Sequence, residues 1–384
     1  MKFSEYLSRV EGSATAKIFA EATRMEANGK HIYHLEIGQP DFLPLPEILE
    51  TTSQSVLAGQ TQYTVSNGIP ELRKSVSQYY SQFSVEPLDY QKNTVITAGG
   101  KLAIYATAWS YLNPGDNAII LNPSWVSYAD IVEALGGEVR FLAVNEDSSF
   151  DESELRSKID SKTKLLFINT PSNPTGSIIS HSNLQKLYDI CAEYGIIIIS
   201  DEMYNEYVYE GYEFHSLGKI KGWMDNAVIV SGLSKTFSMT GFRLGYALGN
   251  QEIISSINKV NQLTASCPVN FAQHAGVVAY ANIEKMRQKI KEIMYPRRQL
   301  VCDILEEMDL PFNPPHGAFY AWLKLDGVTN SIEFGKNLLA KTGVAITPGR
   351  AFGPDGEGYI RLSFATDEDT IKTGFSLLRD FLNS

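Results

Sequence analysis

The chain has 384 residues, of which 43% are hydrophobic and 20% are charged, and it carries a formal net charge of −11. This length and composition predict a globular protein with two domains, or with one large domain and an appendage. The acidic balance argues against nucleic acid and an anionic membrane surface as main partners, because both are bound through basic patches. We therefore expect small-molecule ligands.

Apolar runs in the chain are short, and even a fully aliphatic run such as 196–199 is far too short to cross a bilayer. The first residues also lack the apolar core of a secretory signal, so we expect a cytoplasmic protein. The three cysteines and six histidines show no spacing typical of a disulfide framework or a metal site. We therefore expect no metal.

In chain order, the pattern predicts a helix at 14–29, a short strand at 32–37, a helix at 46–57 and a helix that begins near Pro70. Short apolar runs then alternate with amphipathic stretches such as 101–112 and a helix after Trp125. The predicted strands of this region are 94–97, 117–121, 138–144, 164–169, 196–200, 227–230 and 246–249. Their aliphatic runs predict a mostly parallel, seven-stranded sheet between helices, as in doubly wound α/β proteins.

The pattern changes after about residue 265, where a long helical stretch covers 271–308. The remaining chain is mixed, with predicted strands at 319–323, 344–347 and 359–365, and helices at 332–342 and from Asp367 onward. We expect a large domain at 48–270 and a smaller α/β domain built from 1–47 and 271–384.

Lys235 follows the predicted buried strand 227–230 and stands eight positions before Arg243. A lysine removed from water has its charged form disfavoured, so it can act as an amine nucleophile that forms a Schiff base with a carbonyl. Arginine stays charged and binds carboxylate or phosphate through its fork of donors. On this stretch alone, an ordinary loop lysine and a surface arginine are equally good interpretations.

Asp201 comes directly after four isoleucines and a serine, at the end of a strand expected to be fully buried. An unpaired buried carboxylate is unfavourable, so Asp201 should face a cation or a protonated ring nitrogen. The alternative is an N-cap for the next helix or turn. Tyr204 can reach the same space if the chain turns there.

Gly99, Gly100 and Lys101 lie between a predicted strand and a predicted helix, where free backbone N–H groups attract an anion. The sequence is not a Walker loop, and an ordinary tight turn is an equally good interpretation.

Three further residues point to the same edge of the predicted sheet. Asn173 lies between two prolines after the strand 164–169, and Trp125 follows another strand, where it can lie flat on an aromatic ligand or belong to the core. Arg361 stands inside an apolar strand, which favours an anionic partner such as a carboxylate.

This set combines an amine nucleophile, a carboxylate, regions that bind anions, a flat aromatic ring and a buried arginine. It suits a planar, phosphorylated cofactor with a carbonyl group and a basic ring nitrogen. Pyridoxal 5'-phosphate (PLP) has these properties.

Three motifs also match one family in their order and spacing: the stretch 234–245, Asp201-Glu202-x-Tyr204 and Asn173-Pro174-Thr175-Gly176. The chain resembles the fold-type I PLP-dependent enzymes, specifically the class I/II aminotransferases, from about Ser13 to its C-terminus. Within that family it is similar to the bacterial aspartate/aromatic subgroup.

The resemblance implies a role for each matching residue. Lys235 would be the catalytic residue that forms the Schiff base with PLP and then moves a proton. Asp201 would keep the ring nitrogen protonated. The cofactor-binding residues that the resemblance implies are Gly99, Gly100, Lys101, Trp125, Asn173, Asp201, Tyr204, Ser234, Lys235, Arg243 and Tyr63. The implied substrate-binding residues are Gly38, Lys101, Trp125, Asn173 and Arg361, with Arg361 on the α-carboxylate.

Two positions bear on assembly and on the phosphate. Tyr63 matches the family tyrosine that reaches the phosphate of the neighbouring subunit, which implies a homodimer with shared active sites. Gly232 stands where some members carry a phosphate-binding serine, so that contact is not carried over.

The expected activity is the transfer of an amino group between an L-amino acid and a 2-oxo acid such as 2-oxoglutarate. Lys101 and the segment 13–15 resemble the aspartate subgroup, in which such a lysine is implicated in holding the distal carboxylate. Leu102, Ile104 and Trp109 make the following helix more apolar, so an aromatic or broad-range enzyme stays open. A β-lyase on the same fold is the next hypothesis, and a non-catalytic PLP-binding regulatory protein is the third.

Overall fold

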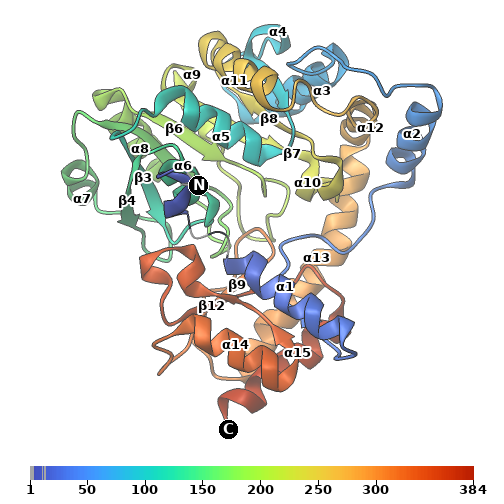
Figure 1. Cartoon of the computed structure of the whole chain (residues 1–384), viewed down its shortest axis with the longest axis vertical. Helices are drawn as coiled ribbons and strands as arrows, with labels where there is room; N and C mark the ends of the chain where they lie inside the picture. Colours follow the sequence, from blue (N-terminus) through green and yellow to red (C-terminus); the bar gives the residue numbers. More distant parts are fainter. Residues whose placement is uncertain (1–3, 11, 13) are drawn as a thin grey trace.

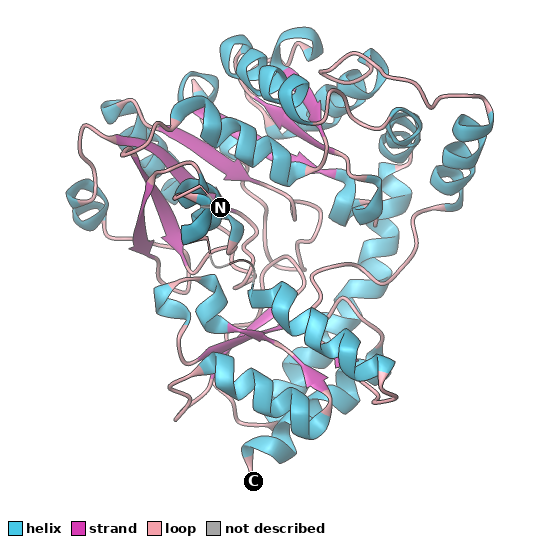
Figure 2. Cartoon of the chain, viewed as in Figure 1, coloured by secondary structure: helices cyan, strands magenta, loops and turns pink. Residues whose placement is uncertain are grey.

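The computed structural model describes residues 4–10, 12 and 14–384 (Figure 1). Ser13, where the resemblance was expected to begin, lies outside the described residues. One large sheet and a smaller group of strands occupy opposite ends of the molecule, and helices surround both (Figure 2). No helix in the described part of the chain combines the length and apolar character that a membrane span needs.

The large sheet has seven strands in the order β2-β8-β7-β6-β5-β3-β4. β8 runs antiparallel to both of its neighbours, and the pairs from β7 to β4 are parallel. The strands are β2 (Thr94–Thr97), β3 (Asn117–Asn122), β4 (Glu138–Ala143), β5 (Thr163–Asn169), β6 (Ile197–Asp201), β7 (Ala227–Gly232) and β8 (Gly245–Leu248). The predicted mostly parallel, seven-stranded sheet is confirmed.

Strand β6 explains why the sheet needs helices on both faces. Ile198 packs into one hydrophobic cluster, and its neighbours Ile197 and Ile199 pack into another on the opposite face. All three side chains are less than a tenth exposed. A strand with apolar side chains on both faces is stable only when both faces are covered.

Helices and short helical turns connect and cover these strands. They are α2 (Pro46–Leu57), α3 (Pro70–Tyr80), η2 (Ser81–Phe83), α4 (Tyr90–Asn93), α5 (Gly100–Tyr111), α6 (Ser127–Ala134), α7 (Glu152–Ser157), α8 (His181–Tyr194), η3 (Leu217–Lys219), α9 (Trp223–Asn226), α10 (Leu233–Thr236), η4 (Thr240–Phe242), α11 (Gln251–Thr264) and α12 (Asn270–Ala281).

The smaller group of strands combines both ends of the chain. Its strands are β1 (Tyr33–His34), which pairs with β10 (Val344–Ala345), and the sheet β11-β12-β9, formed by Thr347–Pro348, Tyr359–Ser363 and Tyr320–Lys324. The helical elements beside them are α1 (Ala14–Ala27), α14 (Ser331–Thr342), η5 (Gly349–Phe352), η6 (Pro354–Gly356) and α15 (Glu368–Leu382), whereas η1 (Leu7–Arg9) packs against α6 at the other end of the molecule. The 25-residue helix α13 (Ile283–Glu307) runs between the two ends of the molecule (Figure 1).

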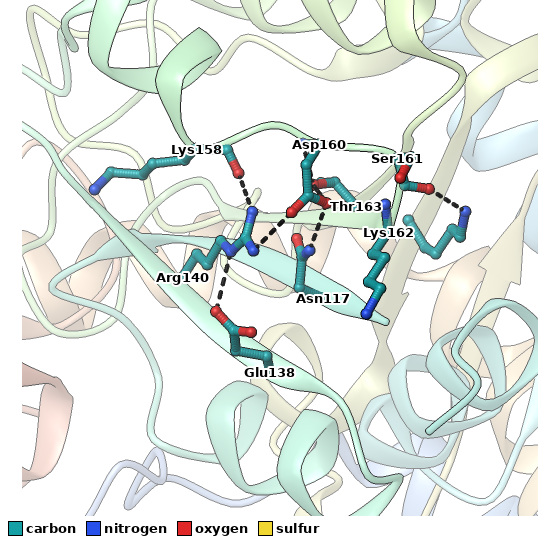
Figure 3. Close-up of polar contacts among 9 residues, drawn as sticks. Asn117, Glu138, Arg140, Lys158, Asp160, Ser161, Lys162 and Thr163 are labelled. Carbon is teal, nitrogen blue, oxygen red and sulfur yellow. Dashed lines mark hydrogen bonds and ion pairs between the residues drawn. The ribbon is translucent and has the colours of Figure 1, made fainter. Parts of the chain in front are cut away.

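A polar network fixes the amino ends of β3, β4 and β5 (Figure 3). Arg140 donates to Asp160 Oδ2 at 2.8 Å and to the Lys158 carbonyl at 2.8 Å, and Asn117 donates to Asp160 Oδ1 at 2.9 Å. The Arg140 hydrogen bond holds the pKa of Asp160 well below its usual range. This network anchors the end of the sheet opposite the cavity described below.

Two predicted strands differ from the structure. The strand predicted at 32–37 is reduced to Tyr33–His34, because the chain then leaves β10 and carries Glu36 and Gly38 toward the cavity. The strand predicted at 344–347 is divided, because the chain changes partner at Ile346, from β1 on one side to β12 on the other.

Candidate active site

A cavity of about 500 Å³ lies at the carboxyl ends of the parallel strands, against the smaller sheet. Eleven predicted site residues line it: Gly38, Gly100, Lys101, Trp125, Asn173, Asp201, Tyr204, Ser234, Lys235, Arg243 and Arg361. A neighbouring cavity of about 420 Å³ shares Asn169 with it, but Lys235, Asp201 and Arg361 are not among its lining residues. The first cavity therefore holds the chemistry that the sequence predicts.

Lys235 lies in α10, the short helix that follows the buried strand β7. Burial, joined by the positive charges of Arg361 and Arg243 and opposed by Asp201, lowers the pKa of Lys235 to about 8. The ammonium group donates a short hydrogen bond to the Gly38 carbonyl. An amine with this pKa is neutral in about a tenth of molecules at pH 7, far more than an ordinary lysine, and its neutral form can act as a nucleophile or base.

Asp201 ends strand β6 and is 5% exposed. Burial raises the pKa of its carboxyl to about 6, and hydrogen bonds from Tyr128 Oη at 2.7 Å and the Met203 amide at 3.2 Å work in the opposite direction. No helix begins here, but the Met203 bond caps the turn at 203–206, so the capping alternative holds for a turn beside the role in the cavity. A buried carboxylate with two neutral donors favours a cationic partner in the cavity.

The predicted anion-binding turn is present at the first turn of α5. Gly99 has φ of 87°, and a Cβ at this position would collide with the guanidinium of Arg243. Arg243 itself has φ of 54° and donates to the Thr240 carbonyl at 2.9 Å. The amino end of a helix therefore lies beside an arginine fork, and both attract an anion such as phosphate.

Lys101, the second residue of α5, turns toward Trp125 instead. Its Nζ lies 4.8 Å from the centre of the Trp125 ring. Burial lowers the pKa of Lys101, Asp130 opposes this, and Arg243 adds to it. Within the described residues, no carboxylate lies at ion-pair distance from this ammonium group.

Arg361, in β12, is 3% exposed and joins the two ends of the molecule. It donates to Asn173 Oδ1 at 2.9 Å, to the Glu36 carbonyl at 2.5 Å and to Thr347 Oγ1 at 3.1 Å. Its Nε is buried without a hydrogen-bond partner in the described part of the chain. A cation held only by neutral acceptors, with donors to spare, is suited to a carboxylate.

Two predicted residues do not line the cavity. Gly99 lies beneath Arg243, and Tyr63 is 87% exposed on the surface of the single chain. Sequence reasoning missed four residues that hold the site residues in place: Glu36, Tyr128, Tyr320 and Thr347. Their contacts join segments far apart in the chain, so no local motif could have indicated them.

A family model for aminotransferase class I and II matches residues 30–376. The chain belongs to this family. Its members use PLP, and the aminotransferase activity and fold that the sequence predicted are confirmed. The β-lyase alternative is not favoured.

Relatives and solved structures of this aminotransferase family cover nearly the whole chain. An aspartate aminotransferase of Sulfolobus acidocaldarius is 32% identical over 99% of this chain and 98% of the relative. An aromatic-amino-acid aminotransferase of Thermococcus litoralis is 32% identical over 100% of this chain and 98% of the relative. The solved aspartate aminotransferase of Thermus thermophilus with maleate has a TM-score of 0.93, with 30% identity and 99% coverage of both chains.

The residues of the cavity fit PLP. A lysine with a lowered pKa can reach a carbonyl, and the buried Asp201 carboxylate suits a protonated ring nitrogen. The backbone cradle at Gly99 and Gly100 is one that a Cβ would fill, since at Gly100 it would meet the Met203 side chain. Arg243 lies beside this cradle and completes an anion site. The amine, the carboxylate and the anion site thus each match one group of PLP: its carbonyl, its ring nitrogen and its phosphate.

Proposed function

We propose that this aminotransferase transfers the amino group of a dicarboxylic amino acid such as aspartate to a 2-oxo acid such as 2-oxoglutarate. The observation that carries the choice of substrate is the Lys101 ammonium group, which lies over Trp125 at the cavity without an ion-pair partner among the described residues. The shared family supports the reaction class, and the relatives named above include aspartate aminotransferases.

We assign PLP to Lys235 for covalent attachment, Asp201 for the ring nitrogen, and Tyr204 and Asn173 for the ring oxygen. Trp125 would stack on the ring. The phosphate would be held by Gly99, Gly100, Ser234 and Arg243. When bound, PLP supplies a carbonyl carbon and an electron-poor ring that stabilises negative charge on the carbon next to the amino group.

The chain's own residues orient the substrate and move its proton. Arg361 binds the α-carboxylate with the donors that its protein partners leave free. This would fix the amino-bearing carbon within reach of Lys235, whose amine would take the proton from that carbon and pass it to the carbonyl carbon that PLP supplies. Thr15 and Phe19 of α1, together with Gly38, cover the cavity and restrict water.

Lys101 is proposed to bind the second carboxylate of the substrate. Arg243 already lies against Gly99 at the anion-binding turn, so the phosphate has a cationic partner without Lys101. The Lys101 side chain points to the Trp125 ring, and its ammonium group has lost part of its hydration. A carboxylate at this place would restore a charged partner to it.

The test is a comparison of amino-acid half-reactions in wild type and Lys101→Met, which keeps the aliphatic stem over Trp125. Measuring single turnover with the amino acid alone avoids the second carboxylate of 2-oxoglutarate. In Lys101→Met, we expect the second-order rate constant of the half-reaction to fall about tenfold to a hundredfold for aspartate, and less than threefold for phenylalanine and alanine. Equal losses for all three, together with weaker PLP binding, would assign Lys101 to the phosphate instead.

A second candidate substrate class is aromatic amino acids. Phe19 and Ile104 line the same cavity beside Trp125, and they form an apolar wall that suits an aromatic side chain. The same half-reactions decide between the classes, since an aromatic enzyme would prefer phenylalanine over aspartate and keep that preference in Lys101→Met.

We also propose a homodimer, as the Tyr63 match implies. Large apolar side chains are exposed where the loop after α2 lies against α11 and α12: Leu57 (84%), Tyr63 (87%), Val65 (55%) and Leu263 (68%). The loop is held there by bonds such as Asn270 Nδ2 to the Gln62 carbonyl at 3.1 Å. Such a patch favours burial against a second copy, and sedimentation equilibrium tests it. The cytoplasmic location and the domain boundaries at 48 and 270 stay predictions.

A further inference from the structure

Tyr320 contacts three of the proposed site residues at once. It begins β9, is 1% exposed and lines the cavity. Its ring lies under the guanidinium of Arg361, with 4.3 Å between the Arg361 Cζ and the ring centre, and its Oη lies 2.9 Å from Tyr204 Oη. A Cβ at Gly38 would collide with the same hydroxyl.

The hydroxyl groups of Tyr204 and Tyr320 carry one proton each, but their oxygens form a single contact with each other. Only one proton can lie between the oxygens, because a hydrogen bond holds a single hydrogen. Within the described residues, neither oxygen has another hydrogen-bond partner. The second proton therefore has to point elsewhere, and both residues line the cavity.

The surrounding charges indicate which phenol donates to the other. Burial raises the pKa of Tyr204 well above its usual value, the neighbouring Tyr320 and the negative charge of Asp201 act in the same direction, and Arg361, which lies against the ring of Tyr320 rather than that of Tyr204, opposes them. Burial also raises the pKa of Tyr320, but Arg361 and the bond with Tyr204 lower it. Tyr320 is therefore the stronger acid of the pair and the better donor, and Tyr204 is the better acceptor.

We propose that Tyr320 is a positioning residue that donates its proton to Tyr204 Oη and thereby directs the Tyr204 proton into the cavity, toward the ring oxygen of PLP. This inference rests on the proposed function, since it needs PLP bound beside Tyr204. The same ring supports Arg361 from below. One side chain of the smaller domain thus orients both the cofactor donor Tyr204 and the carboxylate-binding Arg361.

The test compares Tyr204→Phe, Tyr320→Phe and the double variant, all loaded with PLP. Each change removes one hydroxyl oxygen and keeps the ring, so the packing under Arg361 is retained. The readout is the pH midpoint of the visible absorbance of the bound cofactor. A donor to the ring oxygen stabilises negative charge there, so loss of the donor moves this midpoint to higher pH.

Tyr204→Phe loses the donor itself, and we expect an upward shift of about one pH unit or more. Tyr320→Phe leaves the donor but frees its proton to turn away, so we expect about half a unit in the same direction. Because Tyr320 acts only through Tyr204, the double variant should match Tyr204→Phe alone. Non-additive shifts of this kind are expected only of residues that act on each other.

Tyr209→Phe is the matched control. Tyr209 is 2% exposed, and its hydroxyl donates to the Ala318 carbonyl at 2.7 Å, away from the lining of the cavity. Its midpoint should equal that of wild type. The inference is overturned if Tyr320→Phe also equals wild type, or if its shift adds in full to that of Tyr204→Phe. If wild type binds no PLP and transfers no amino group, the proposed function fails as well, so the two failures are distinguishable.

Discussion

Tyr128→Phe removes one of the two hydrogen bonds that Asp201 accepts from the protein. Tyr128 is 1% exposed and donates to Asp201 Oδ2 at 2.7 Å, and only the Met203 amide at 3.2 Å is left in the variant. A hydrogen bond to an ionised carboxylate is worth about 1.5–3 kcal/mol, and one to a neutral carboxyl about 0.5–1.5 kcal/mol. The difference of about 1.4 kcal/mol corresponds to about one pKa unit.

The pKa of Asp201 should therefore rise from about 6 in the cofactor-free protein to about 7 in Tyr128→Phe. Because the folded-state pKa lies above the unfolded value, ionisation of Asp201 opposes folding, and stability is lost as pH rises through the folded pKa. The variant has the larger loss. Urea unfolding should show that Tyr128→Phe is less stable than wild type by about 1 kcal/mol at pH 5 and by about 2–2.5 kcal/mol at pH 8.

The matched control is again Tyr209→Phe, whose hydroxyl donates to a neutral carbonyl oxygen. Its loss of stability should be the same at both pH values, because no titrating group loses a partner. If the loss in Tyr128→Phe were equally independent of pH, Tyr128 would act on Asp201 only through packing or as a neutral hydrogen bond. The electrostatic account of the site would then be wrong.

Two further substitutions test the segment that covers the cavity. Gly38→Ala places a Cβ against Tyr320 Oη, so we expect urea unfolding to show a loss of about 1–3 kcal/mol in the free energy of unfolding. Adding Tyr320→Phe to the same chain should partly restore this stability. An unchanged free energy of unfolding in Gly38→Ala would contradict the close contact. The hydrogen bond to buried Glu36 raises the pKa of His34, Glu26 adds to this effect, and burial opposes it. The charged form of His34 therefore stabilises the folded protein. This stabilisation is fully present below about pH 6.5 and is lost as pH rises through the folded-state pKa. His34→Gln should accordingly lower the melting temperature more at pH 6 than at pH 9, and an equal effect at both pH values would exclude the charged pair.

Residues at the ends of strands could be predicted from the sequence, because a buried parallel strand is recognised by its apolar run. The run before Asp201 and the run before Lys235 each predict where the side chain emerges, and parallel strands bring such positions to one edge. Arg361 could be predicted for a different reason, since an arginine inside an apolar strand favours an anion.

Residues that support the site from another segment could not be predicted in this way. Tyr128 meets Asp201 across 73 positions and Tyr320 meets Tyr204 across 116 positions. Both contacts depend on how a helix or a strand packs in the folded protein. In the sequence alone, a tyrosine within an apolar stretch indicates only a core residue. The predicted strand at 32–37 is shortened for a related reason, because the residues after Leu35 leave β10 and line the cavity.

Arg361 shows why the two ends of the molecule form one site. Its guanidinium has five N–H donors, of which three are used by Asn173, Glu36 and Thr347, and the buried Nε is left without a partner in the described residues. All three acceptor atoms are neutral, so burial of the positive charge is offset only through space, by the Glu36 carboxylate and the Tyr320 and Tyr204 phenols. A structural arginine would have a carboxylate here. If Arg361 binds the substrate as proposed, the α-carboxylate would relieve part of this unfavourable burial on binding. Because Asn173 follows β5 of the large sheet and Thr347 lies in β11 of the smaller one, that gain in binding would depend on the present position of the two sheets relative to each other.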